Sequence, residues 1–504
     1  MGLKILFLAA EAAPLSKVGG LGDVAGSLPK ALAALGHEVR VVIPFSGVID
    51  RQRFRPKLLT RVAVPHVGGD QVARIFELRL EGVTFNLVAG PPIPRARRVY
   101  GTDIAEDGPK FIFFCLAALG LCRALDWAPD VLHANDSHTG AAVYWLAEAG
   151  IHDDLFRQTA SVFTIHNLVY MNNGAGPYLR AYGLAPSDSP LLPDWARDSL
   201  MGLGLAHADV LNTVSPRHAR EILTPEFGYG FEGLLAARRD RLSGILNGLD
   251  LAQWNPATDR QIAARFDRSR LPRRAANKRA LQRELHLPAL PRVPLLGIVS
   301  RLDTQKGFDL AAPALRQLLA GPDTVQVAVL GSGLKPIEDA FQDLARDFPD
   351  QVRVELRFDP ALARQIYAGA DLLLIPSRYE PCGLAQMIAQ RYAAVPVVRR
   401  TGGLADTVVD AARARQGTGF MFTDYNAPAL LKAVRRALRL YRRPAGWQAL
   451  QRRGLHLAER FAWTESAKAY VVLYQRAILR RKESVARLAP EQTGEPLETT
   501  SQPT

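Results

Sequence analysis

Several features that would place the chain in other classes of protein are missing from its 504 residues. No apolar run of about 18 or more residues occurs, so the sequence predicts no membrane-spanning helix. Three cysteines in so long a chain (Cys115, Cys122 and Cys382) argue against a disulfide framework and favour a reducing, cytoplasmic compartment. An acidic residue and a glycine loop follow the apolar start, where a signal peptide would have its cleavage site, so we expect a first β-strand there.

Signatures of metal and nucleic-acid sites are also absent from the sequence. A metal site built from His133, Asp136, His138 and His166 is disfavoured, because no closely spaced H-x3-H or C-x2-C pair occurs among them. The net charge is +14, yet no zinc-finger, helix-turn-helix or RNA-binding signature accompanies the basic clusters. We therefore expect no nucleic-acid partner and no bound metal or other cofactor. A solvated basic face that attracts a small anionic substrate is the favoured interpretation.

What the sequence does contain is a repeated alternation of short apolar strands, turns and helices. This alternation predicts α/β architecture, with two doubly wound domains whose parallel sheets carry helices on both faces. The expected strands are 5–10, 39–43, 130–136, 161–167, 294–300, 325–333, 371–377 and 395–398, and the expected helices include 23–35, 139–150, 278–287 and 309–319.

The domain boundaries follow from this alternation. We predict an N-terminal domain at 1–258, a second domain at 259–464, and a C-terminal helix at 465–483 that packs back on the first domain. The tail at 484–504 is predicted to be disordered, because its composition is polar and lacks aromatic residues. In open α/β sheets ligands bind beyond the carboxyl ends of the strands, so the polar loops at those ends are the candidate functional segments.

The first such loop is S-K-V-G-G-L-G-D-V-A-G, residues 16–26. Its glycines Gly19 and Gly20 allow close approach of a ligand to the backbone, Lys17 offers a charge for a phosphate, and Asp23 can cap the following helix. The spacing matches neither the dinucleotide motif G-x-G-x-x-G nor a P-loop. Taken alone, a structural strand-to-helix turn explains this loop equally well.

Two loops in the second domain supply complementary charges. S-R-L-D-T-Q-K-G (300–307) carries Arg301 and Lys306, two cations that suit a diphosphate whose oxygens gain charge as a bond breaks. P-S-R-Y-E-P-C-G-L (376–384) carries Glu380, followed by Cys382, which is better explained as an inert buried thiol than as a nucleophile. A glycine turn, R-T-G-G-L-A-D-T-V, follows at 400–408. In the first domain T-I-H-N (164–167) ends a strand with His166.

Taken together and in this order, these motifs resemble the motifs of bacterial glycogen synthases and plant starch synthases. The set consists of K-V-G-G-L-G-D-V, T-I-H-N, G-I-L-N-G-L-D and the three loops of the second domain. The resemblance covers roughly residues 3–475. It implies the GT-B fold, with two Rossmann-like domains facing across a cleft. It also implies retaining transfer of glucose from ADP-glucose to the non-reducing end of an α-1,4-glucan such as glycogen, without a metal.

The resemblance further implies roles for individual residues. Glu380, His166, Arg301 and Lys306 would act on the transferring glucose and the leaving diphosphate. Asp136 and Asn167 would lie near the acceptor. The implied donor-binding residues are Lys17, Gly19, Gly20, Asp23, Asn247, Phe358, Cys382, Gly383, Leu384, Thr401, Gly402 and Gly403.

Three positions depart from the pattern of the family or its relatives. Ser137 stands where the family usually has tryptophan, and Phe358 where a tyrosine often stacks on adenine. Ile388 replaces a second glutamate found in related GT-B enzymes. Two alternatives stay open: a GT-B transferase with another donor, such as UDP-glucose, or another acceptor, and a glucan-binding protein without catalysis. The intact Lys17 and Glu380 speak against the last alternative.

Overall fold

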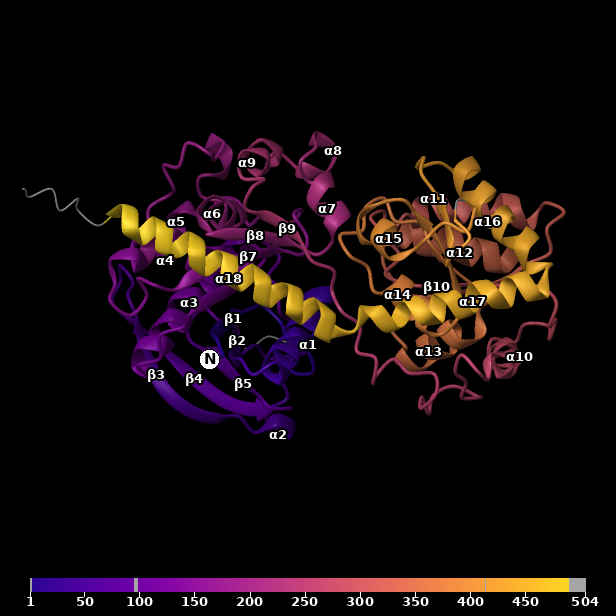
Figure 1. Ribbon diagram of the computed structural model, residues 1–504, viewed down its shortest axis with the longest axis horizontal. Helices are drawn as coiled ribbons and strands as arrows, with labels where there is room; N and C mark the ends of the chain where they lie inside the picture. Colours follow the sequence, from indigo (N-terminus) through magenta and orange to yellow (C-terminus); the bar gives the residue numbers. More distant parts are fainter. Residues whose placement is uncertain (1, 95–97, 413, 489–504) are drawn as a thin grey trace, which may run out of the picture.

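The computed structural model describes residues 2–94, 98–412 and 414–488, and within them it contains two β-sheets with helices packed around each (Figure 1). The first sheet has nine strands in the order β3-β4-β5-β2-β1-β6-β7-β8-β9, and the second has six in the order β12-β11-β10-β13-β14-β15. Two such Rossmann-like units confirm the predicted α/β, GT-B fold class.

The strands of the first sheet run parallel from β2 to β9, and β5 pairs in parallel with β2. At the other edge, β3, β4 and β5 form an antiparallel meander that the sequence analysis missed. The strands are β1 Lys4–Leu8, β2 Glu38–Pro44, β3 Lys57–Val64, β4 Gln71–Leu80, β5 Val83–Ala89, β6 Val131–Asn135, β7 Ala160–Ile165, β8 Val210–Thr213 and β9 Leu242–Gly244. The helices are α1 Gly20–Ala34, α2 Arg51–Phe54, α3 Ile104–Ala124, α4 Gly140–Glu148, α5 Gly176–Ala181, α6 Leu200–His207, α7 Pro216–Glu221, α8 Pro225–Gly228 and α9 Glu232–Ala237.

The second sheet is parallel throughout. Its strands are β10 Leu295–Val299, β11 Gln326–Leu330, β12 Val352–Glu355, β13 Leu372–Ile375, β14 Val395–Arg399 and β15 Phe420–Phe422. Its helices are α10 Arg274–Glu284, α11 Phe308–Leu319, α12 Lys335–Asp347, α13 Pro360–Gly369, α14 Ala385–Arg391, α15 Gly402–Thr407, α16 Ala427–Tyr441 and α17 Pro444–Ala458.

Continuous apolar runs form the central strands of the second sheet because both of its faces are covered. On β13, Leu373 packs into one hydrophobic cluster, whereas Leu372 and Leu374 pack into another on the opposite face. The covering helices are amphipathic: α12 buries Ile337, Phe341 and Leu344, which recur at helical spacing. The apolar periodicity in the sequence thus accounts for the layered arrangement.

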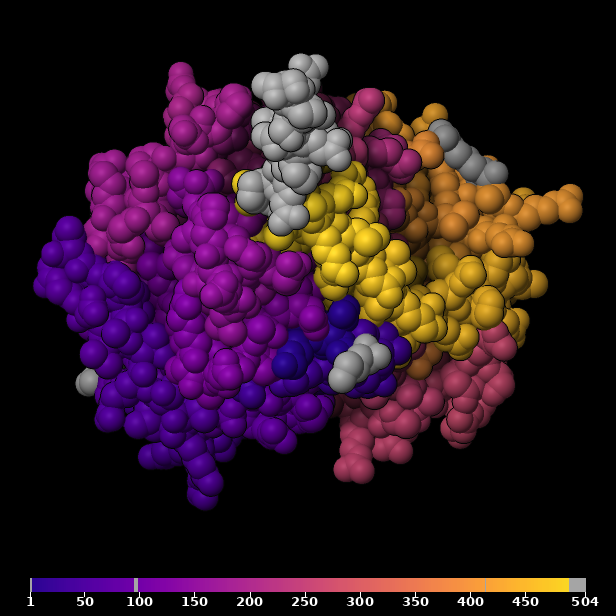
Figure 2. Space-filling view, turned by 60° about the vertical axis from the view of Figure 1, so that its left-hand side comes forward, coloured from indigo at the N-terminus to yellow at the C-terminus, as the bar shows by residue number. Residues whose placement is uncertain are grey.

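A long helix, α18 (Trp463–Leu488), returns from the second unit and lies along the first (Figures 1 and 2). Its Tyr474 hydroxyl lies 2.8 Å from Nδ1 of His133 on β6, and its Tyr470 hydroxyl accepts a hydrogen bond from Asn212 on β8 at 3.0 Å. The predicted disordered tail began at residue 484, which is wrong for 484–488, because the helix continues through them. Residues 489–504 lie outside the described residues.

The chain crosses between the two units twice, and a backbone hydrogen bond joins the two crossing segments. Leu249 N–H donates to the carbonyl of Phe461 at 2.5 Å. A Cβ on Gly248 would lie 2.5 Å from Cα of Trp463, so only glycine permits this approach.

In residues 2–94, 98–412 and 414–488, none of the helices has the length and apolar character needed to span a membrane.

Candidate functional site

The glycine loop after β1 is organised by a buried carboxylate, Glu11, which the sequence analysis missed. Its side chain accepts hydrogen bonds from the backbone N–H groups of Val18 and Gly19. Burial raises the pKa of Glu11 despite these bonds. A Cβ on Gly22 would come within 3.2 Å of the same carboxylate. An acidic residue directly after an apolar strand and before a glycine loop was the sequence signal that could have identified it.

Helix α1 begins at Gly20, three residues before the predicted start at Asp23. Asp23 therefore does not cap the helix, and the expectation that it would was wrong. Instead it lies in the first turn and pairs with Lys17 at 2.6 Å, where both side chains are partly exposed. Gly20 faces open space, since a Cβ there would meet nothing within 4 Å. The loop thus presents a cation and uncrowded backbone at the carboxyl end of β1.

Asp136 joins the ends of the neighbouring strands β6 and β7. Its Oδ1 accepts from the backbone N–H of His166 at 2.6 Å and of Asn167 at 3.2 Å. The ring Nε2 of His166 lies 2.9 Å from Oδ1 of Asn135. Burial lowers the pKa of His166 to about 3, so its imidazole is neutral near pH 7. Burial also raises the pKa of Asp136 to about 7.

Asp136→Asn is expected to stabilise the fold more at pH about 8 than at pH about 4. The folded-state pKa of Asp136, about 7, lies above its ordinary value of 3.8. Between these values the folded chain keeps a proton that the unfolded chain has released, so this carboxyl lowers the free energy of unfolding progressively as the pH rises. Asparagine cannot ionise, and its Oδ1 can still accept both backbone bonds. Thermal melting of both proteins at the two pH values measures the difference, and an equal effect at both would contradict the assignment.

In the second domain the predicted residues Glu380 and Lys306 are brought together. Nζ of Lys306 lies 2.7 and 2.9 Å from the two carboxylate oxygens of Glu380, and Ser377 Oγ donates to one of them at 3.0 Å. These residues line a cavity of about 130 Å³ beyond the carboxyl ends of β10 and β13. The Glu380 side chain is buried, whereas that of Lys306 remains about one-fifth exposed. The pair therefore has one face open to a ligand.

The glycine turn before α15 packs directly on the Glu380 loop. Gly403 N–H donates to the carbonyl of Glu380 at 3.0 Å, and Gly402 N–H donates to Glu221 of α7 in the first domain at 2.9 Å. Thr401 Oγ1 lies 3.3 Å from the same carboxylate. Glu221, also missed in the sequence, thus joins the two units beside the candidate site. No motif signals Glu221, because its contact with Gly402 joins segments far apart in the sequence and has no local pattern.

Cys382 and Asn247 also meet between the two units. Burial raises the pKa of the Cys382 thiol to about 12, and a hydrogen bond from the backbone of Asn247 opposes this only in part. The thiol is therefore protonated near pH 7, as expected for an inert buried cysteine. Gly383 adopts a φ of +76°, and Leu384 occupies the N-cap position of the following helix α14 without a side-chain hydrogen bond.

Two predicted residues stand apart from this hydrogen-bonded cluster. Phe358, between β12 and α13, is 91% exposed. The Arg301 side chain is 61% exposed and lies 3.5 Å from Asp303. Both present accessible groups, an aromatic face and a guanidinium, that a bound ligand could contact.

Comparison with known families matches both halves of the chain. Residues 4–237 match the family described as the starch synthase catalytic domain. Residues 288–450 match glycosyl transferases group 1. The two matches fall on the first and second sheet, respectively.

Individual relatives extend over nearly the whole chain. A glycogen synthase from Moorella thermoacetica is 42% identical, covering 96% of this chain and 98% of the relative. A glycogen synthase from Anaeromyxobacter dehalogenans is 46% identical, covering 94% of this chain and 99% of the relative. The solved catalytic domain of starch synthase IV from Arabidopsis thaliana, bound to ADP and acarbose, superposes with a TM-score of 0.87 at 32% identity, covering 95% of this chain and all of that one. Sucrose-phosphate synthase from Thermosynechococcus elongatus, at 19% identity and TM-score 0.59, shares the fold.

Proposed function

This chain belongs to the glycogen synthase and starch synthase family, and we propose that it transfers glucose from ADP-glucose to the non-reducing end of an α-1,4-glucan, with retention of the anomeric configuration. The observation that carries the proposal is the Lys306–Glu380 pair at the carboxyl end of β13, with the Thr401–Gly403 turn packed on its loop. Such a pair places a cation for a phosphate beside a carboxylate for a sugar.

The charges support this division of roles. Lys306 and Arg301 follow β10, and Lys17 follows β1, so all three cations stand at the carboxyl ends of strands, where ligands of this fold bind. We assign them to the diphosphate, whose leaving oxygens gain negative charge in the transition state. They supply that positive charge without a bound metal. ADP as the nucleotide is supported by the related starch synthase IV, whose solved structure holds ADP.

The remaining polar groups suit the sugar and the acceptor. Glu380 is assigned to the hydroxyls of the transferring glucose and to stabilising the positive charge that develops at its anomeric carbon. A neutral His166 can donate or accept a hydrogen bond with a sugar hydroxyl without adding charge. Asp136 has one oxygen committed to backbone bonds, so its role near the acceptor is to hold His166 and Asn167 in place.

All three cysteines are free and buried, which supports a cytoplasmic location.

The donor is tested by incubating purified protein with glycogen and either radiolabelled ADP-glucose or radiolabelled UDP-glucose. We expect label to enter polymer from ADP-glucose at a much higher rate. A preference for UDP-glucose would replace the proposed donor and favour the alternative transferase. No incorporation from either donor would refute the proposed activity.

A further inference from the structure

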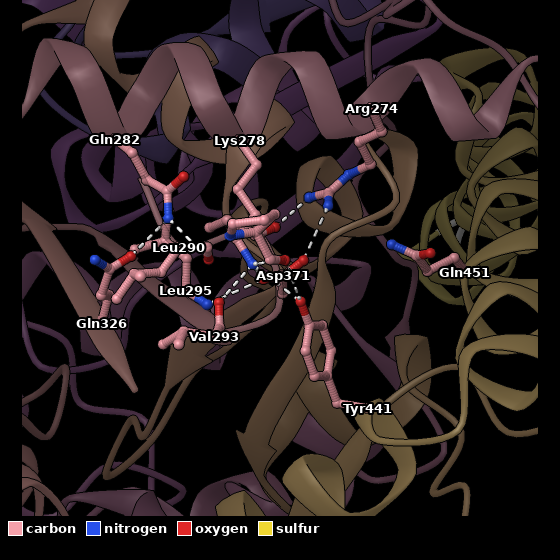
Figure 3. A network of polar contacts seen from close by, with 12 residues as sticks. Arg274, Lys278, Gln282, Leu290, Val293, Leu295, Gln326, Asp371, Tyr441 and Gln451 are labelled. Carbon is pink, nitrogen blue, oxygen red and sulfur yellow. Dashed lines mark hydrogen bonds and ion pairs between the residues drawn. The ribbon is translucent and has the colours of Figure 1, made fainter. Parts of the chain in front are cut away.

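A second cavity, of about 730 Å³, lies at the opposite end of the second sheet from Lys306, Ser377 and Glu380. It is bounded by α10, the end of α16 and the start of α17 (Figure 3). Asp371, which lines it, directly precedes β13, whereas Ser377 and Glu380 follow that strand. Six residues of nearly extended chain from Asp371 to Ser377 span roughly 20 Å. The cavity is therefore separate from the proposed donor site.

The charges lining this cavity are predominantly positive. Four cationic side chains (Arg274, Lys278, Arg292 and Arg442) line it together with a single carboxylate, that of Asp371. Arg442 also lies 3.7 Å from Asp323, which is outside the lining. The carboxylate is already neutralised, since Lys278 Nζ lies 2.6 Å from its Oδ2 and the Leu295 N–H donates to the same oxygen at 3.0 Å. An excess of cations remains in the cavity wall, and a wall of this kind attracts anions.

One of the buried cations keeps an unused donor. Arg274 is 6% exposed; its Nε donates to the carbonyl of Tyr392 at 2.9 Å, and its Nη2 donates to the carbonyl of Ala370. Its Nη1 forms a long ion pair with Asp371 at 3.7 Å, beyond hydrogen-bonding distance, and donates no hydrogen bond within residues 2–94, 98–412 and 414–488. Figure 3 shows the Arg274 side chain directed from α10 toward Asp371, between Lys278 and Gln451.

A buried tryptophan in the cavity wall has an unsatisfied donor as well. Trp447 is 5% exposed, and its Nε1–H is without an acceptor in the described part of the chain. Its ring packs edge-on against Tyr441, with centroids 5.2 Å apart. Leaving a buried donor unpaired destabilises the folded chain. A ligand with several acceptor oxygens would relieve that cost, and the two rings would cover its less polar part.

Two helix N-termini add to the positive potential. Helices α10 and α17 both begin at the cavity, and neither has a side-chain cap or an acidic residue in its first turn. The N-terminal end of a helix carries a partial positive charge. Here that charge adds to the cations instead of being offset by carboxylates. We propose that this cavity binds the phosphate group of a small phosphorylated metabolite, a phosphate monoester, away from the site of glucose transfer.

The test measures binding to the full chain by calorimetry, with inorganic phosphate and glucose 6-phosphate as probes and glucose as the neutral control. Saturating ADP is present throughout to occupy the proposed donor site. We expect saturable binding of both anions and none of glucose. R292Q/R442Q, which removes two exposed cations from the cavity rim, should weaken phosphate binding about tenfold or more. W447F, which keeps an aromatic ring but removes the donor, should weaken it by a smaller factor.

R239Q/R346Q is the matched control, because it removes the same charge from two exposed arginines outside the cavity. It should bind phosphate as the unaltered chain does. Equal weakening in both double variants would show general attraction to a basic surface and overturn the proposal, as would the absence of saturable binding by the unaltered chain. Incorporation of glucose into glycogen, measured in the same preparations, reports on the proposed function independently, so its failure and the failure of this site are distinguishable.

Discussion

Glu380→Ala is expected to abolish glucose transfer, lowering kcat by about 10²- to 10³-fold or more, while ADP binds with nearly unchanged affinity. The carboxylate is buried, and it pairs with Lys306 and Ser377 at the carboxyl end of β13. Its removal takes away the one group that we assign to the developing charge on the sugar. Lys306 stays in place and is relieved of its partner, so the diphosphate keeps its cation. Radiolabel incorporation measures turnover, and calorimetry with ADP measures binding.

Two further variants separate charge from shape in this prediction. Glu380→Gln keeps the size of the side chain and an oxygen for Ser377 but loses the charge, so we expect intermediate activity. Glu355→Ala is the matched control: it removes a carboxylate that pairs with Arg357 in the same domain, on the last residue of β12. It should leave turnover unchanged. Near-normal turnover in Glu380→Ala would show that the role assigned to this loop is wrong.

Gly402→Ala is expected to reduce both stability and activity, with a loss in the free energy of unfolding on the order of 3 kcal/mol. Gly402 has a φ of +41°, and a Cβ there would lie 1.9 Å from the carbonyl oxygen of Glu380. That backbone atom cannot move aside without displacing the Glu380 loop. The substitution would also disturb the bond from Gly402 N–H to Glu221. Chemical denaturation measures the stability, and the glycogen assay measures turnover.

Gly233→Ala provides the comparison, because a Cβ at this helical position in α9 would meet nothing within 4 Å. We expect no loss of stability from it, and a small gain in helix propensity. If Gly402→Ala proved as stable and as active as Gly233→Ala, the close packing of the glycine turn on the Glu380 loop would not constrain the site.

The sequence by itself determined the fold class and the loops that form the candidate site. Strand–turn–helix periodicity depends on local apolar patterning, which can be read directly along the chain. For the same reason, the loops that carry Lys17, Arg301, Lys306 and Glu380 could be placed after strands. The ordered set of motifs then identified the family, which the relatives confirm.

Only the tertiary structure decided which residues meet. The bond from Gly402 to Glu221 and the ordering of the glycine loop by Glu11 depend on contacts that carry no local pattern. In the antiparallel part of the first sheet, β3 and β4 were missed because they are only partly buried and lack a continuous apolar run. The cavity beside Asp371 collects side chains from α10 and α17, about 170 residues apart in sequence, so no linear motif could reveal it. Local periodicity therefore specified the elements, and long-range packing specified the sites.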